Sequence, residues 1–173
     1  MAFTLIHPFQ SVRSADVSTV QWLLALHVTG AFFLLGGAMF ATILSILGQR
    51  AQRPSELAAF MGVARFAVVF ILAGEMMLLV FGLWLVHEFH FSFGSFWIWA
   101  SLVLFVVSGV AGKKGGDREG GTRALALELA AKDDVTTDEL RAKVNDRVTL
   151  ALSGGAGILA LVILALMVWK PGG

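Results

Sequence analysis

The stretch VQWLLALHVTGAFFLLGGAMFATILSIL (20–47) decides the fold of this chain, because it contains no Lys, Arg, Asp or Glu. An α-helix needs about 20 predominantly apolar residues to cross a hydrocarbon core of about 30 Å. Three further apolar runs follow at residues 58–86, 93–111 and 148–169, without the alternation that is typical of barrel strands. The sequence therefore predicts an all-α integral membrane protein, a four-helix bundle with up-down-up-down order.

The composition excludes several classes of protein. The chain is 57% hydrophobic, with a mean hydropathy of +0.81, whereas soluble domains average about 45–50% apolar residues. Its 173 residues fit one membrane domain, 1–173, with one sizeable loop at 112–147. The absence of Cys excludes disulfides, thiol catalysis and iron–sulfur clusters. The formal net charge of +1 indicates no nucleic-acid partner, and residues 1–17 lack the apolar core of a signal peptide, so we expect the first helix to be retained.

Two kinds of residue orient the predicted helices. The five tryptophans all fall at one end of the bundle: Trp22, Trp84, Trp97, Trp99 and Trp169. Indole rings favour the interface between lipid tails and headgroups. Most Lys and Arg residues lie at the opposite end, in the loops after the first and third runs, and the positive-inside rule places those loops in the cytoplasm. We expect a multi-pass protein of the bacterial inner (cytoplasmic) membrane, with the N-terminus and the C-terminus outside.

Loop 112–147 is the main polar part of the chain. The glycine-rich residues 113–121 predict a flexible segment, and residues 122–132 (TRALALELAAK) predict a short amphipathic helix. Thr137 predicts the N-cap of a helix through Asn145 that continues into the fourth apolar run.

Small residues predict where the helices pack, because they allow close approach in lipid. The first helix is expected to present one stripe: His27, Gly30, Leu34, Gly37, Ala41 and Ser45. The fourth helix is expected to present Ser153, Gly157 and Ala160. We therefore expect Gly37 and Gly157 to lie at helix contacts.

Ionisable side chains inside the spans are the candidate functional residues. Glu75 lies past the middle of the second span, where an ionised carboxylate is costly, so it is either a structural group or part of a proton pathway. His27 lies about one-third of the way into the first span, level with Leu79 in an antiparallel pair and about 3 Å of helical rise from Met77. Imidazole and thioether groups at similar depth suit a b-type haem or copper, which makes His27 and Met77 candidate ligands. The alternative interpretations are a structural hydrogen bond from His27 to a neighbouring helix and plain packing for Met77.

His87 and His90 lie in the predicted outer hairpin, with Glu88 between them. They are candidate ligands of a divalent metal at the membrane surface. Interfacial polarity alone is the alternative explanation.

Three motifs carry a family resemblance: WLLALHVTGAFFLLGG (22–37), WIWASLVL (97–104) and MVWKPGG (167–173). Together they resemble the bacterial family of predicted integral-membrane proteins designated domain of unknown function 2269, over residues 21–171. More distantly, the LH of the first helix and its glycine pair resemble membrane proteins of the copper-resistance D type and the haem-binding, four-helix protoporphyrinogen oxidase. That resemblance implies that His27 binds haem. The oxidase's arginine in helix one and lysine in helix three have no counterpart here, so its reaction is not expected.

The leading functional hypothesis is a small membrane protein that is haem-binding or redox-associated through His27. One alternative is a cofactor-free accessory or scaffold subunit of a larger membrane complex, or a homo-oligomer. A second alternative is a proton or ion pathway centred on Glu75. Catalytic residues are not identified from the sequence, and whether the protein is an enzyme stays open.

Overall fold

The computed structural model describes residues 12–171, with side chains from Thr19 onward. This part of the chain is helical and contains no strand. The helices are α1 (Val12–Arg50), α2 (Pro54–Glu88), α3 (Phe96–Lys132), α4 (Asp138–Val144) and α5 (Arg147–Trp169). Four helical stretches among the described residues are long and apolar enough to cross a membrane, which confirms the predicted all-α membrane bundle.

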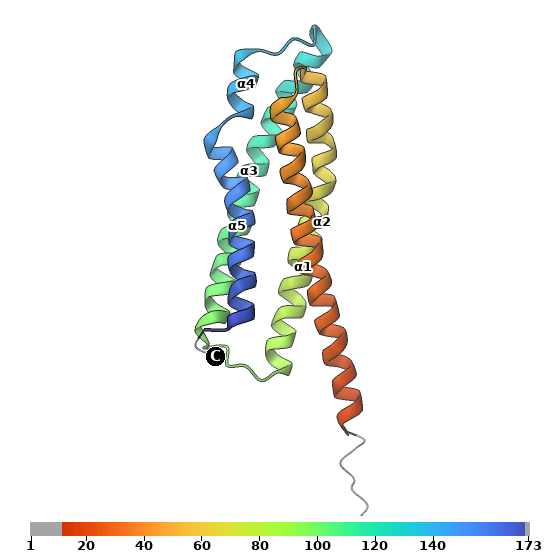
Figure 1. Cartoon of the computed structure of the whole chain (residues 1–173), viewed down its shortest axis with the longest axis vertical. Coiled ribbons are helices and arrows are strands. Elements are labelled where there is room, and N and C mark those ends of the chain that lie inside the picture. Colours follow the sequence, from red (N-terminus) through yellow and green to blue (C-terminus); the bar gives the residue numbers. More distant parts are fainter. Residues whose placement is uncertain (1–11, 172–173) are drawn as a thin grey trace, which may run out of the picture.

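The long helices form two antiparallel pairs that lie side by side (Figure 1). α1 packs along α2, and α3 packs along α5. The two pairs meet mainly where α2 contacts α3, whereas α1 and α5 touch little. We call the end with the α1–α2 turn and α4 the loop end, and the opposite end the tryptophan end.

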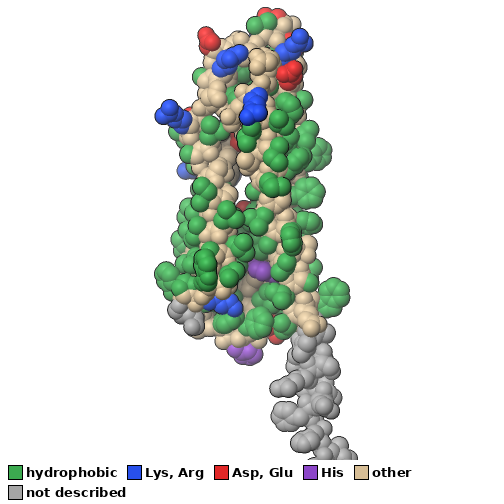
Figure 2. All heavy atoms as spheres, viewed as in Figure 1, with side chains coloured by type: hydrophobic (Ala, Val, Ile, Leu, Met, Phe, Trp, Pro, Cys, Tyr) green, Lys and Arg blue, Asp and Glu red, His purple; other side chains and the backbone are tan. Residues whose placement is uncertain are grey.

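Two small cores join the pairs, one at each end. At the loop end, Leu57 and Ala58 of α2 pack against Ala126 and Leu140. At the tryptophan end, Val86 of α2 packs against Trp97 and Ile98 of α3. Between these cores few side chains of the spans are fully buried, and Figure 2 shows a narrow gap between the two pairs. The pairs are therefore joined at their ends and separated near mid-membrane.

Glycines bring the backbones of α1 and α2 together. A Cβ on Gly74 would lie 2.5 Å from the backbone nitrogen of Leu34 and 2.6 Å from the backbone oxygen of Gly30. A Cβ on Gly37 would lie 3.0 Å from the backbone oxygen of Ala67. The predicted contact at Gly37 is therefore confirmed. The predicted stripe is wrong at Ser45, whose side chain is exposed.

The α3–α5 contact confirms the predicted position of Ser153 but not that of Gly157. Ser108 Oγ donates to the backbone oxygen of Ala156 at 3.1 Å, and a Cβ on Gly115 would lie 2.7 Å from Ser153 Oγ. Nothing lies within 4 Å of a Cβ placed on Gly157. The prediction that Gly157 lies at a helix contact is therefore wrong. The physical reason is that α5 has one main neighbour, so most of its surface, small residues included, faces outward.

α3 continues without a break through the glycine-rich residues 113–121, and the prediction of a flexible segment there is wrong. Glycine costs about 1 kcal/mol relative to alanine inside a helix. Contacts along this segment offset that cost. Within the segment, Lys113 forms an ion pair with Asp117 at 2.9 Å. Two contacts reach the start of α5: Arg118 forms an ion pair with Asp146 at 2.9 Å, and Glu119 accepts a hydrogen bond from Ser153 at 2.8 Å. The segment is a rigid extension of α3 that reaches the loop end.

The helix that Thr137 begins is short. The Thr137 side chain accepts a hydrogen bond from the Leu140 backbone N–H, which confirms the predicted cap. The helix ends at Val144, however, and α5 begins anew after Asp146. The Asp146 carboxylate accepts from the backbone N–H groups of Val148 and Thr149. Because this carboxylate binds the free N–H groups of a new helix start, α4 does not continue into α5 as predicted.

The glycine contact makes a prediction about Gly74. Gly74→Ala should lower the melting temperature in detergent, with a destabilisation of roughly 1–3 kcal/mol, because the added methyl group meets backbone atoms that have no alternative rotamer. Gly109→Ala is the matched control, since nothing lies within 4 Å of its Cβ position. It should leave the melting temperature unchanged or raise it, because alanine is the better helix former. Equal effects at both sites would contradict the close contact of α1 and α2.

Candidate functional site

The His27 imidazole lies against α2. A Cβ on Gly82 would lie 2.9 Å from its Cε1 and 3.2 Å from its Nδ1, so only glycine leaves room for the ring. The ring also contacts the backbone of Leu78. Nδ1 is buried and has no hydrogen-bond partner among the described residues. The Nδ1 side of the ring is thus covered by α2.

Glu75 lies on the face of α2 that points toward the α3–α5 pair. Residues 75, 82 and 86 are separated by seven and four positions, which places them on one side of a helix. Val86 on this side packs against α3. We call this side, with Glu75, Leu78, Gly82 and Val86, the inter-pair face of α2.

Glu75 lies deep in the span. It is about nine residues along α2 from Trp84, or ~14 Å of helical rise, which is about half of a 30 Å hydrocarbon core. Its side chain is half-buried. None of the ion pairs found among the described residues includes it.

His27 and Glu75 therefore share the inter-pair face, because the imidazole covers Leu78 and Gly82 of that face. Figure 2 shows a histidine side chain between the two helix pairs, part-way along their length. Met77 lies differently. Its Cβ is 2.8 Å from a Cβ placed on Gly30, and it is about 140° around α2 from Gly82. The geometry thus favours Glu75 over Met77 as the neighbour of His27 on one face.

At the tryptophan end, His87 lies in the last turn of α2, and His90 lies in the short turn that follows. The indole N–H of Trp84 donates to Glu88 Oε1 at 3.0 Å, and His90 Nδ1 lies 2.9 Å from the backbone oxygen of Glu88. The Glu88 carboxylate is therefore engaged by the indole. Among the residues that the structure describes, no group of three or more His, Cys, Asp or Glu side chains could hold a metal ion. A metal bound by His87 and His90 stays a prediction from the sequence.

At the loop end, the connection between α3 and α4 holds the start of α2. Asp134 accepts hydrogen bonds from Ser55 Oγ at 2.7 Å and from the Ser55 backbone N–H at 2.9 Å, and these bonds lower the pKa of the Asp134 carboxyl. Thr136 Oγ1 donates to the backbone oxygen of Gln52 at 2.8 Å. Asp134 thus caps a helix far away in sequence. The sequence did not predict this cap. Its local signal, the pair Asp133 and Asp134, indicates only that a helix ends there.

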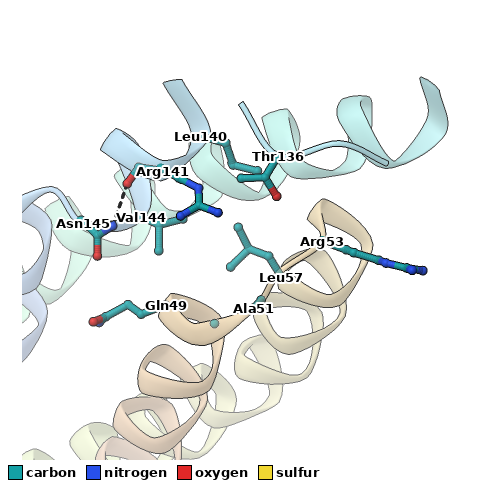
Figure 3. Close-up of a pocket in the computed structure, with 10 residues that line it drawn as sticks. Gln49, Ala51, Arg53, Leu57, Thr136, Leu140, Arg141, Val144 and Asn145 are labelled. Carbon is teal, nitrogen blue, oxygen red and sulfur yellow. Dashed lines mark hydrogen bonds between the residues drawn. The ribbon is translucent and has the colours of Figure 1, made fainter. Parts of the chain in front are cut away.

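A cavity of about 50 Å³ lies between α4 and the α1–α2 turn. Arg141 points into it and Arg53 points away from it (Figure 3). Leu57, Leu140 and Val144 contribute apolar walls. The cavity has room for a few water molecules, which makes it a packing defect of the loop-end core and no substrate site.

A second hollow, of about 260 Å³, opens on the outer surface of the α1–α2 pair. It is lined by Phe32, Phe33, Gly36, Gly37, Phe40 and Phe70. Since none of these side chains is polar, the hollow offers only apolar contact, as a lipid-facing surface does.

The comparisons with known proteins agree with this architecture. The family model described as "Predicted integral membrane protein (DUF2269)" matches residues 21–171, which include the four spans and the loop end. No curated protein and no solved structure matches the chain. The chain belongs to the family of predicted integral membrane proteins with the domain of unknown function 2269.

Proposed function

We propose that this membrane protein accepts and passes protons at the inter-pair face, with Glu75 and His27 as the two proton-binding groups. The observation that carries the proposal is their shared position. Two ionisable side chains from different helices lie on one face within the membrane span, with Glu75 near its middle and His27 nearer to the tryptophan end.

The cost of such residues supports a functional role. A charged side chain at the centre of a bilayer costs about 3 kcal/mol on insertion scales, and such residues mark ion pathways and proton relays. A structural Glu75 would need a partner to lower that cost. The described residues supply no ion pair to it. A carboxyl group that binds a proton and exchanges it with a nearby imidazole avoids a permanent charge.

The pair also has suitable spacing. His27 contacts Leu78, one turn of α2 from Glu75, and Gly82, two turns away. The two groups are therefore separated by about 5–10 Å along the helix axis, a gap that one or two bridging water molecules can span.

Proton flux into proteoliposomes tests this proposal. With an imposed potential and a pH-sensitive dye inside the vesicles, Glu75→Gln should lower the flux at least about tenfold, because the amide cannot take up and release a proton. Glu128→Gln is the matched control, since it removes an exposed carboxylate at the loop end, where it pairs with Lys132. Wild-type flux in the Glu75→Gln protein would contradict the proposal.

A second candidate function is binding of a b-type haem through His27. The fixed position of the imidazole supports it, since the ring rests on Gly82 and on the backbone of Leu78, and an imidazole held in one orientation is suited to ligate a metal. Haem would supply one-electron chemistry. In this arrangement His27 is the single ligand that α1 contributes, and Met77 would have to reach around α2 to provide another.

Absorption spectra separate the two candidates. If His27 binds haem, protein produced with haem available should show a Soret band that His27→Ala abolishes and His87→Ala retains. His87→Ala is the control, because His87 lies about 8 residues, or ~12 Å, nearer to the tryptophan end than His27 and so cannot replace it as a ligand. Glu75→Gln should keep the band. A colourless, stable wild-type protein after haem reconstitution would overturn this candidate and leave the proton proposal untouched.

The charge pattern supports an orientation with the loop end in the cytoplasm of a bacterium, in the inner membrane, and both termini outside. Single cysteines at Ser92 and Val135 test it, because both side chains are exposed at opposite ends of the bundle. On intact spheroplasts an impermeant maleimide should label Ser92→Cys and leave Val135→Cys unlabelled. The reverse pattern would invert the orientation.

A further inference from the structure

One arginine from α2 and one from α3 lie at the seam between these helices. The guanidinium of Arg123 lies against Gly62, with its terminal nitrogen 3.8 Å and its Nε 4.0 Å from a Cβ placed on that glycine. Arg65 is three residues further along α2, which places it on the adjacent part of the same surface, about 4.5 Å away along the axis. Ala58 and Ala126, which are buried in the loop-end core, hold the two helices together one turn nearer to the loop end.

Neither arginine is neutralised by the protein. The four ion pairs found among the described residues use Lys113, Arg118, Lys132 and Lys143 and do not include Arg65 or Arg123. Arg123 Nε is buried without a hydrogen-bond partner. The carboxylate nearest in sequence, Glu119, accepts a hydrogen bond from Ser153 of α5. A buried N–H without a partner is costly, and the charge of the guanidinium has no partner in the ion pairs of the described residues, so this seam suits an anion from outside the chain.

Depth identifies the kind of anion. Trp84, at the tryptophan end of α2, and Arg65 are about 19 residues apart, which corresponds to ~29 Å of helical rise and matches the ~30 Å hydrocarbon core. If indoles mark one edge of the core, Arg65 marks the other, and Arg123 lies just beyond it at the level of Gly62. Both guanidinium groups are thus at the height of lipid phosphates.

We infer that Arg65 and Arg123 form a binding site for a phosphodiester anion, the headgroup of an anionic phospholipid, at the loop-end edge of the membrane. Arg65 is exposed and reaches the headgroup from the lipid side, while the half-buried Arg123 holds the phosphate from within the seam. Gly62 leaves the guanidinium of Arg123 free of a side chain on α2. Planar guanidinium groups bind phosphate oxygens in pairs of parallel hydrogen bonds, which suits two arginines on one phosphate.

The site does not depend on the proposed proton or haem functions, because it shares no residue with the inter-pair face. Its consequence is structural. A lipid held by α2 and α3 would tie the two helix pairs together at a third place, beside the loop-end core.

Thermal unfolding of the full chain in detergent tests the site, with three additives: phosphatidylglycerol, phosphatidylcholine and inorganic phosphate. Phosphatidylglycerol should raise the melting temperature of the wild-type protein, whereas phosphatidylcholine, which has no net charge, should not. The double variant Arg65→Gln/Arg123→Gln should need at least about tenfold more phosphatidylglycerol for half of that increase, since hydrogen bonds between charged groups are about twice as strong as neutral ones.

Lys114→Gln is the matched control. Lys114 is on the same helix as Arg123, is exposed, and lies about 180° around α3 from it. This variant should respond to phosphatidylglycerol as the wild-type protein does. If the double glutamine variant does not fold, the variant Arg65→Lys/Arg123→Lys replaces it, because lysine keeps the charge and removes the guanidinium geometry. The phosphatidylglycerol concentration that gives half of the increase in melting temperature should then rise at least about threefold.

The outcomes separate the sources of the anion. In one outcome, inorganic phosphate raises the melting temperature as much as phosphatidylglycerol does, with the effect lost in the double variant. That result would keep the two-arginine site and assign it to free phosphate. Equal stabilisation by phosphatidylglycerol and phosphatidylcholine, or an unchanged response in the double variant, would overturn the site.

Discussion

The close backbone contact between α1 and α2 is the constraint on which the rest of this structure depends. Lipid tails are as apolar as leucine, so helices in a membrane gain little from hiding apolar side chains and associate through close packing instead. Gly30, Gly37 and Gly74 allow that packing, because a side chain on any of them would meet the facing helix within about 3 Å. The contact fixes the register of the pair, and the register sets the imidazole of His27 against Gly82.

The second determinant is that the two helix pairs are joined at their ends. The loop-end core and the tryptophan-end core both involve α2, which therefore connects the pairs, while α1 and α5 touch little. This arrangement leaves Glu75 of the inter-pair face half-buried and outside both packed cores. A tightly packed four-helix bundle would bury Glu75 against apolar side chains and force it to be a permanently neutral structural group. The open middle is what makes exchange of protons, or access of a cofactor to His27, physically reasonable.

The loop end is a folded part of the molecule. Asp134 caps α2 from the connection between α3 and α4, and Arg118 on the extended α3 pairs with the N-cap of α5. These polar contacts hold the extension of α3 over the start of α2, which brings Arg123 next to Gly62. The same extension that completes the loop-end core therefore places an unpaired arginine at the edge of the membrane. Folding of the polar segment and recognition of anionic lipid are linked through this one helix.

The sequence by itself determined the apolar spans, the tryptophan end and the identity of the polar residues within the spans, because hydropathy and charge are local properties that the bilayer sorts by depth. It also located the packing surface of the first helix at Gly37. Only the tertiary structure decided which helices are neighbours, and three results follow from that. Gly157 faces outward because α5 has one main partner. The glycine-rich part of α3 is helical because contacts with Asp146 and Ser153 stabilise it. Glu75, and not Met77, shares the face of His27, because the position around a helix matters as much as the depth along it.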